Sequence, residues 1–125
     1  MDNYRRGWAL RYLREAKAEL EAARKLPYMA PSLLLEAIRK ARNAIYYSLG
    51  EPAFIEVLIR DEVGRPKPTD DSLLRFLVEI EQTVQQLSQV EEVNGEAMMQ
   101  QADTLVSIAA DIVETLTEEN PKTNQ

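Results

Sequence analysis

The sequence predicts an all-α fold: an up-and-down four-helix bundle with an additional short helix, arranged as two antiparallel helical hairpins. Three observations support this prediction. Four long segments repeat apolar residues every three or four positions, which is the period of a helix with one buried face. Prolines and glycines stand between these segments, where breaks between helices are expected. Only one short segment is rich in β-branched residues, and a single strand would have no partner with which to pair.

The first helix is expected over residues 4–26, with apolar side chains on one face and basic side chains on the other. The apolar face holds Trp8, Ala9, Tyr12, Leu13, Ala16, Leu20 and Ala23. The basic stripe holds Arg6, Arg11, Arg14, Lys17, Arg24 and Lys25. Pro27 and Pro31 bracket the expected break after this helix, because proline does not continue a helix interior.

The second helix is expected to run from a cap at Ser32 to about Leu49, with Gly50 as a left-handed stop. Its buried stripe would consist of Leu34, Ala37, Ile38, Ala41, Ile45 and Leu49. Alanine recurs at helical spacing in both segments, at Ala9, Ala16 and Ala23 and then at Ala37, Ala41 and Ala44. Because small side chains let two helices approach closely, the sequence predicts a tight antiparallel hairpin for residues 4–49.

A short third helix is expected over residues 53–63, which contain five large apolar residues. These are Phe54, Ile55, Val57, Leu58 and Ile59. The β-branched content also permits a strand, but that strand would be unpaired. The prolines and the glycine of residues 64–68 predict a loop.

Two further long helices are expected, one from a cap at Thr69 or Asp70 to about Glu92, and one from a turn at Asn94–Gly95 to about Glu118. The first has an apolar seam of Leu73, Leu77, Ile80, Val84 and Leu87. The second has a seam of Met98, Ala102, Leu105, Ala109, Ile112 and Leu116. These heptad-like steps predict that the two helices pack on each other knobs-into-holes. Residues 1–118 would form a single helical-bundle domain, and residues 119–125 a polar, disordered tail.

The composition excludes several classes of function. The chain contains no histidine and no cysteine, so it lacks Ser-His-Asp triads, imidazole acid–base catalysis and every metal site built on His or Cys ligands. Its four glycines are isolated and form no phosphate-binding loop. The sequence therefore favours a protein that is not an enzyme, with no catalytic residue, no metal site and no cofactor.

The same composition predicts a cytoplasmic location without membrane association. No apolar run approaches the roughly 20 residues that span a bilayer. The charged N-terminal segment does not resemble a signal peptide, and a chain without cysteine has no disulfide framework.

Charge is divided unequally along the chain. Residues 1–50 hold ten Lys/Arg and five Asp/Glu, a net charge of +5, whereas residues 51–125 hold five Lys/Arg and sixteen Asp/Glu, a net charge of −11. Such asymmetry indicates partners rather than fold. The basic part is expected to face the acidic part, a second copy of it, or an outside polyanion.

The most unusual surface is expected on the side of the second helix that points away from its apolar stripe. It carries Arg39, Arg42, Asn43, Tyr46 and Tyr47. Guanidinium groups beside phenol rings are suited to a protein contact, or to binding phosphate and stacking on bases. In the alternative interpretation this side faces the acidic second hairpin, with the tyrosines half-buried and the arginines paired.

Two other groups of charges have less specific interpretations. The basic stripe of the first helix could follow a phosphate backbone, but the interleaved Glu15, Glu19 and Glu21 favour a salt-bridged face. Acidic residues of the second part could hold Mg²⁺, as in helical nucleotide pyrophosphohydrolases, but their spacing favours solvation. These acidic residues are Glu79, Glu81, Asp103, Asp111 and Glu114.

The first hairpin contains a pattern of Trp8, Tyr12, Leu13, Ala16, Leu20 and Ala23, followed by Leu35, Ala37, Lys40, Ala41 and Ala44. This pattern resembles the opening hairpin of HEPN-domain proteins. It implies a small all-helical bundle, often dimeric and encoded beside a nucleotidyltransferase partner. Active members are ribonucleases that use an Arg followed a few residues later by a His. Here Arg42 is followed by Tyr47 at the corresponding spacing, and a phenol with a pKa near 10 is not a general base at neutral pH. The resemblance therefore implies a non-catalytic member.

The sequence thus favours a non-catalytic, HEPN-like helical-bundle protein that acts by homodimerisation and by association with a protein partner, such as a nucleotidyltransferase. Arg39, Arg42, Tyr46 and Tyr47 are expected to form that contact. The alternative is an RNA- or nucleotide-binding module with weak or no ribonuclease activity. A Mg²⁺-dependent nucleotide hydrolase is a third, less supported, possibility.

Overall fold

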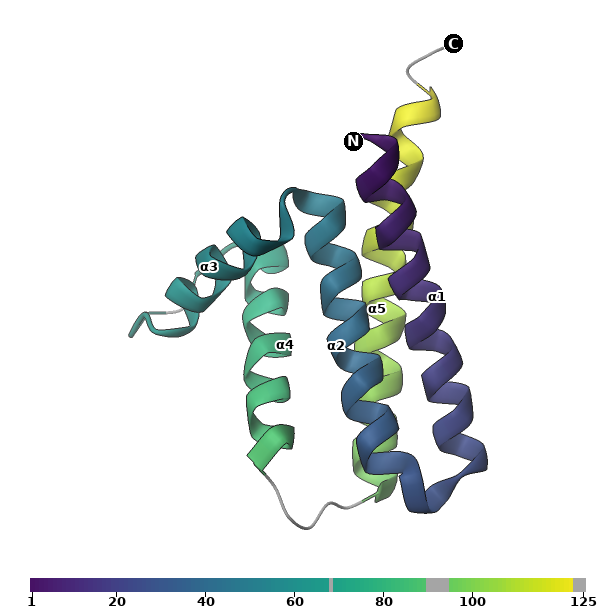
Figure 1. Cartoon of the computed structure of the whole chain (residues 1–125). Coiled ribbons are helices and arrows are strands. Elements are labelled where there is room, and N and C mark those ends of the chain that lie inside the picture. The colour runs from purple at the N-terminus through teal and green to yellow at the C-terminus, as the bar shows by residue number, and fades with distance from the viewer. Residues whose placement is uncertain (68, 90–94, 123–125) are drawn as a thin grey trace.

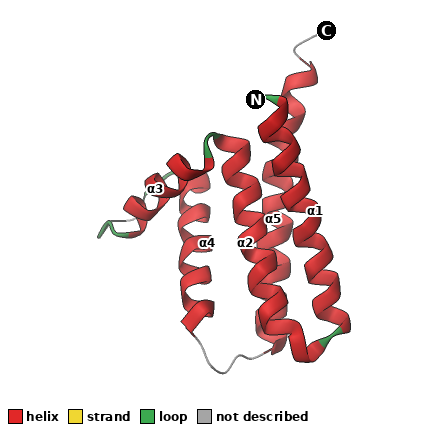
Figure 2. Cartoon of the chain, in the orientation of Figure 1, coloured by secondary structure: helices red, strands yellow, loops and turns green. Residues whose placement is uncertain are grey.

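The computed structural model describes residues 1–67, 69–89 and 95–122, with side chains described to Glu118. Every regular element in these residues is helical (Figures 1 and 2). The elements are α1 (Asn3–Lys25), the 3₁₀ helix η1 (Pro27–Met29), α2 (Ala30–Leu49), α3 (Pro52–Val63), α4 (Ser72–Gln89) and α5 (Gly95–Lys122). The all-α prediction is confirmed, and residues 53–63 form the predicted short helix rather than a strand.

The central element is α2, which contacts α1, α3, α4 and α5. Beyond these contacts, α5 also packs against α1, and α4 against α3. Four of the largest fully buried side chains therefore come from α2: Leu34, Ile38, Ile45 and Tyr46. Figure 1 shows α4 and α1 on opposite sides of α2.

Buried alanines lie in the helices α1 and α2, which pack closely against each other. Ala9, Ala16, Ala37, Ala41 and Ala44 are 0% exposed, and Ala23 is 3% exposed. Because methyl side chains keep the two backbones near each other, α1 and α2 share the most extensive contact of any two helices in the described residues. The predicted role of these small residues is confirmed.

Several helix ends differ from the predictions. The helix α2 begins at Ala30, before Ser32, so Ser32 is not its cap. Pro31 lies within its first turn, where the N–H that proline lacks would have no helical partner. Gly50 ends α2 with φ 170° and ψ −149°, which is extended backbone and not the predicted left-handed conformation. The cap of α4 is Asp71, whose Oδ1 accepts a hydrogen bond of 2.9 Å from the N–H of Leu74.

The predicted seams are buried, but they do not pack chiefly on each other. Leu77, Ile80 and Val84 of α4 are buried in the core, and α4 packs against α2 and α3. The α5 seam is buried from Met98 to Ala109, and α5 packs against α2 and α1. Both α4 and α5 thus pack against α2.

The far end of α5 lies beyond the predicted domain boundary. The helix runs to Lys122 rather than ending near Glu118. The end of the fourth helix near Glu92 and the turn residue Asn94 fall outside the described residues, as does the tail from residue 123 onward. None of the described helices combines the length and the apolar character that a membrane span requires.

Candidate functional site

The five predicted site residues of α2 do not share one surface. Arg39, Arg42 and Tyr46 lie toward α4, because each bonds to a side chain of that helix. Tyr47 lies toward α1, where it contacts two aromatic rings. Asn43 is half-buried, and its Oδ1 accepts a bond of 3.4 Å from Nε of Arg42.

At the centre of the α4 side lies the buried carboxylate of Glu81. Its Oε1 accepts hydrogen bonds from the Tyr46 hydroxyl at 3.0 Å and from Nη1 of Arg42 at 3.1 Å. Glu81 is 2% exposed and Tyr46 is 1% exposed. Burial, and then the negative charge of Glu81, raise the pKa of the Tyr46 phenol well above its usual range. A buried charge requires such partners, so this triad acts as a polar connection between α2 and α4.

The expectation that Tyr46 and Arg42 project outward is wrong. Tyr46 lies in the core, and the Arg42 side chain is only 15% exposed because it pairs with Glu81. The alternative interpretation, in which this side faces the acidic part of the chain, describes the paired Arg42, although Tyr46 is fully buried and not half-buried. The physical reason is that α2 has contact faces on more than one side, since it packs against four other helices.

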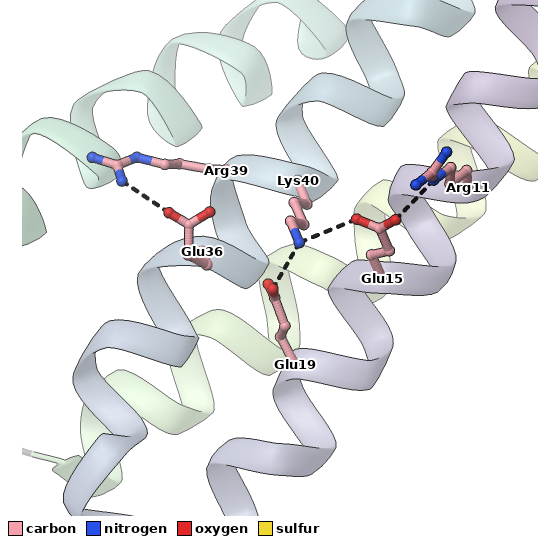
Figure 3. A network of polar contacts seen from close by, with 6 residues as sticks. All are labelled: Arg11, Glu15, Glu19, Glu36, Arg39 and Lys40. Atoms are coloured by element: carbon pink, nitrogen blue, oxygen red, sulfur yellow. Dashed lines mark hydrogen bonds and ion pairs between the residues drawn. The ribbon is translucent and has the colours of Figure 1, made fainter.

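Arg39 is the most exposed of the residues that face α4. Its side chain is 38% exposed, and its Nη1 pairs with Glu36 at 3.1 Å. Its Nη2 also donates to the Ser88 hydroxyl of α4 at 3.3 Å. Figure 3 shows the side chain directed away from Lys40 of the same helix. Arg39 is thus a paired residue at the edge of the α2–α4 contact.

Tyr47 belongs to an aromatic cluster between α1 and α2. Its ring stacks on Trp8 at 6.2 Å and on Tyr12 at 5.7 Å between centroids. The Arg11 guanidinium lies over the Trp8 ring at 4.9 Å. Burial raises the pKa of Tyr47 above its usual range. The ring faces are used within the chain, in the manner of a packed contact.

A network of ion pairs lies between α1 and α2 beside this cluster (Figure 3). Nζ of Lys40 lies 2.8 Å from Glu19 and 3.1 Å from Glu15, and Arg11 pairs with Glu15 at 2.9 Å. The bond to Glu19 raises the pKa of Lys40, and bonds from Arg11 and Lys40 lower that of Glu15. Glutamates thus neutralise the basic side chains here, as the salt-bridged interpretation predicted.

The basic first part also faces acidic residues of the second part. Lys17 pairs with Glu114 of α5 at 3.6 Å, and Arg24 pairs with Asp103 of α5 at 2.8 Å. Together with the Arg42–Glu81 pair, these contacts link the positive part of the chain to its negative part. The sequence left three partners open for the basic part. For Lys17, Arg24 and Arg42, the partner is the acidic part of the same chain.

These pairings also bear on the carboxylates that could hold Mg²⁺. Glu81, Asp103 and Glu114 each face a cationic side chain of the first part. In the portion of the chain that the structure describes, no group of three or more acidic side chains is placed to hold a metal ion.

A group of exposed apolar side chains lies on α3, which the sequence did not single out as a site. Phe54 is 62% exposed, Val57 is 58% exposed and Leu58 is 46% exposed. The three residues fall on one side of the helix, at positions i, i+3 and i+4. We call these three side chains the α3 apolar face. Opposite them, Ile59 is 3% exposed and packs into the core.

A signal for this face was present in the sequence. Apolar residues occur around nearly the whole of α3, as in a helix that is covered on every side. A short helix at the edge of a small bundle can bury only one side, so the remaining apolar side chains are exposed. Contiguous exposed apolar residues are typical of a contact surface.

A hollow of about 480 Å³ lies between α3 and α4, next to this face. Its apolar wall includes Leu49, Ile55, Leu58, Ile59, Leu73, Leu74 and Leu77, and its charged residues are Asp61, Glu62, Arg65 and Asp71. Leu58 belongs both to the wall and to the α3 apolar face, so the two form a continuous apolar surface. The described part of the chain thus offers an apolar contact surface beside an apolar recess.

Comparison of the chain with models of known families, with curated proteins and with solved structures finds no match. The resemblance to HEPN-domain proteins therefore stays a prediction.

Proposed function

We propose that this chain is a non-catalytic association protein that forms a homodimer through the α3 apolar face. The observation that carries the proposal is the exposure of Phe54, Val57 and Leu58 on one side of a single helix. Burying large apolar side chains is the dominant favourable contribution to most protein association. Phe54 has the character of an interface anchor, since aromatic residues are enriched at interfaces.

The location of the contact differs from the one that the sequence favoured. The Arg42 and Tyr46 side chains already bond to Glu81 within the chain, and Tyr47 already stacks on two rings. A partner at that face would have to replace these internal contacts. At α3, by contrast, association would remove apolar surface from water without breaking the bonds of this triad.

Three finer features belong to the same proposal. The first is HEPN-like character, supported by the buried alanines that carry the resemblance. The second is an up-and-down arrangement of the four long helices as two antiparallel hairpins, supported by the close α1–α2 contact. The third is a cytoplasmic location, supported by a chain without cysteine, which needs no oxidising compartment for disulfides. A nucleotidyltransferase-type protein stays the proposed class of additional partner.

Sedimentation equilibrium over a range of concentrations tests the homodimer. We expect a dimer for the wild-type chain, and a monomer of unchanged helicity for the double variant Phe54→Ser and Val57→Ser. Tyr28→Ser is the matched control, because Tyr28 is 81% exposed but lies in η1, away from α3. A wild-type monomer at every concentration, or a double variant that still dimerises like the control, would overturn the proposal.

RNA or nucleotide binding is the alternative, and it has less support. Its expected Arg39 and Arg42 both pair with carboxylates of the described chain. Three residues of the basic stripe do the same, namely Arg11, Lys17 and Arg24. A salt-sensitive shift of end-labelled RNA on a native gel would favour this alternative. RNA shortened by the wild-type chain but not by Arg42→Ala would show a ribonuclease.

A further inference from the structure

We infer that the α3 apolar face docks on the same face of a second copy in antiparallel orientation, and that Phe54 of each copy enters the hollow between α3 and α4 of the other. This inference rests on the proposed homodimer and adds its register and orientation. An interface of this kind is isologous, because the same patch serves both copies.

The first argument is the fit between the protruding side chain and the recess. Phe54 is 62% exposed, and it is not part of the lining of the hollow in its own chain. Leu58 belongs to the lining of the hollow, which consists of leucine and isoleucine side chains together with four charged residues. An aromatic ring placed there would leave water and would meet apolar atoms on the α3 and α4 sides.

The second argument is the spacing of the residues around the hollow. A knob from one helix enters a hole made by residues i, i+3, i+4 and i+7 of its partner. On α3 and the segment that follows it, these positions are Leu58, Asp61, Glu62 and Arg65, and all four line the hollow. We place Phe54 of the partner subunit in this hole. By symmetry, the two-fold axis then passes midway along α3 between Phe54 and the hole of the same copy, which is beside Leu58.

The third argument is electrostatic. Glu51 and Arg65 are exposed and lie seven residues before and after Leu58. Glu51 directly precedes α3 and Arg65 follows its end, so the two residues lie at opposite ends of the helix. Nε of Arg65 also pairs with Glu62 of its own chain at 3.0 Å, near the end of the proposed contact. An antiparallel two-fold axis at Leu58 brings Glu51 opposite Arg65 of the partner subunit at both ends of the contact. A parallel pairing would place like charges opposite each other, which is unfavourable.

The position of α3 permits such a contact. Figure 1 shows α3 extending sideways past α4, away from α1 and α5. A second copy can therefore approach the α3 apolar face without meeting the three-helix core of α1, α2 and α5.

Because the chain has no cysteine, a single introduced thiol reports on the two-fold axis. We expect copper-catalysed oxidation to convert Leu58→Cys into a disulfide-linked dimer, since side chains at an axis meet their own symmetry mates within disulfide range. Ile108→Cys is the matched control, because Ile108 is an apolar residue of α5 with a comparable exposure of 41%. We expect this control to remain a monomer on a non-reducing gel.

A charge exchange tests the orientation without altering the apolar contact. Glu51→Arg alone and Arg65→Glu alone would each place like charges opposite each other twice per dimer, and we expect each to weaken dimerisation about tenfold. The double variant restores the opposite pairing, and we expect it to dimerise like the wild type.

The outcomes separate the inference from the proposed function. A wild-type dimer without crosslinking at position 58 and without rescue by the charge exchange would overturn the register while leaving the homodimer in place. A monomeric wild type would overturn both. Crosslinking at position 58 together with rescue would establish the antiparallel α3 pair.

Discussion

The hydroxyl of Tyr46 donates a hydrogen bond of 3.0 Å to the carboxylate of Glu81, and neither residue is more than 2% exposed. The bond joins α2 to α4 through two residues that lie 35 positions apart in sequence. Arg42 completes the arrangement by supplying the positive charge. Because α4 packs against α2 and α3, this buried group is a principal polar tie between α4 and the rest of the described bundle.

Removal of the Tyr46 hydroxyl is expected to destabilise the fold. Tyr46→Phe keeps the ring but deletes one hydrogen bond to a buried carboxylate, and we expect a loss of about 2 kcal/mol in the free energy of unfolding. Urea denaturation followed by circular dichroism measures it. Tyr28→Phe, at an 81% exposed position, should be neutral, and equal losses in the two variants would contradict the assigned role of the bond.

Removal of the carboxylate is expected to cost more. Glu81→Ala leaves Arg42 beside an empty, largely buried space without its counter-charge, and we expect a loss of about 3 kcal/mol or more. Glu79→Ala serves as the control, because Glu79 is an exposed carboxylate on the same helix. If thermal unfolding gave the same midpoint for both variants, the triad would not be the tie between α2 and α4.

Alkaline pH is expected to weaken the fold. Tyr46 and Lys40 both have a pKa that is raised in the folded chain. The unfolded chain therefore loses these protons first, so the stabilisation is full below about pH 10 and declines as the pH rises further. Urea denaturation at about pH 8 and about pH 11 should show this decline, with a smaller decline in Tyr46→Phe. Equal free energies at the two pH values would contradict the expectation.

Enlarging a buried alanine is expected to separate α1 from α2. Ala16 is 0% exposed, so Ala16→Leu overpacks a filled contact and should cost about 2 kcal/mol or more in the free energy of unfolding. Ala18→Leu is the matched control, because Ala18 is an exposed residue of the same helix. Denaturation midpoints that shift equally for the two variants would show that the alanine spacing does not govern the approach of the helices.

Periodicity was sufficient to identify the helices, because each apolar seam is a local property of its segment. The breaks were also predictable from proline and glycine, although Pro31 lies inside the first turn of α2 and Gly50 is extended. Which seam meets which was not predictable. The seams of α4 and α5 resemble those of two helices that pack together, but both helices pack on α2. A heptad pattern shows which face of a helix is buried and does not show which helix covers it.

The candidate site shows the same limit. The sequence identified Arg42 and Tyr46 as unusual, and their buried partner Glu81 was noted only as one of several acidic residues. The pairing depends on two helices being brought together across the chain, which residue spacing alone does not reveal. Exposure of Phe54 is likewise a consequence of where α3 lies, since an apolar helix of the same composition would be buried at the centre of a bundle.

The central position of α2 has a consequence for synthesis of the chain on the ribosome. The α1–α2 pair is complete once the first 49 residues have emerged, but the α2 surface for α5 stays uncovered until the last helix has been made. During translation of the intervening segment, the side of α2 that packs against α5 lacks part of its final cover. The nascent chain thus passes through a stage in which an apolar surface of α2 is exposed. Chaperones that bind exposed apolar surfaces can bind the chain at that stage.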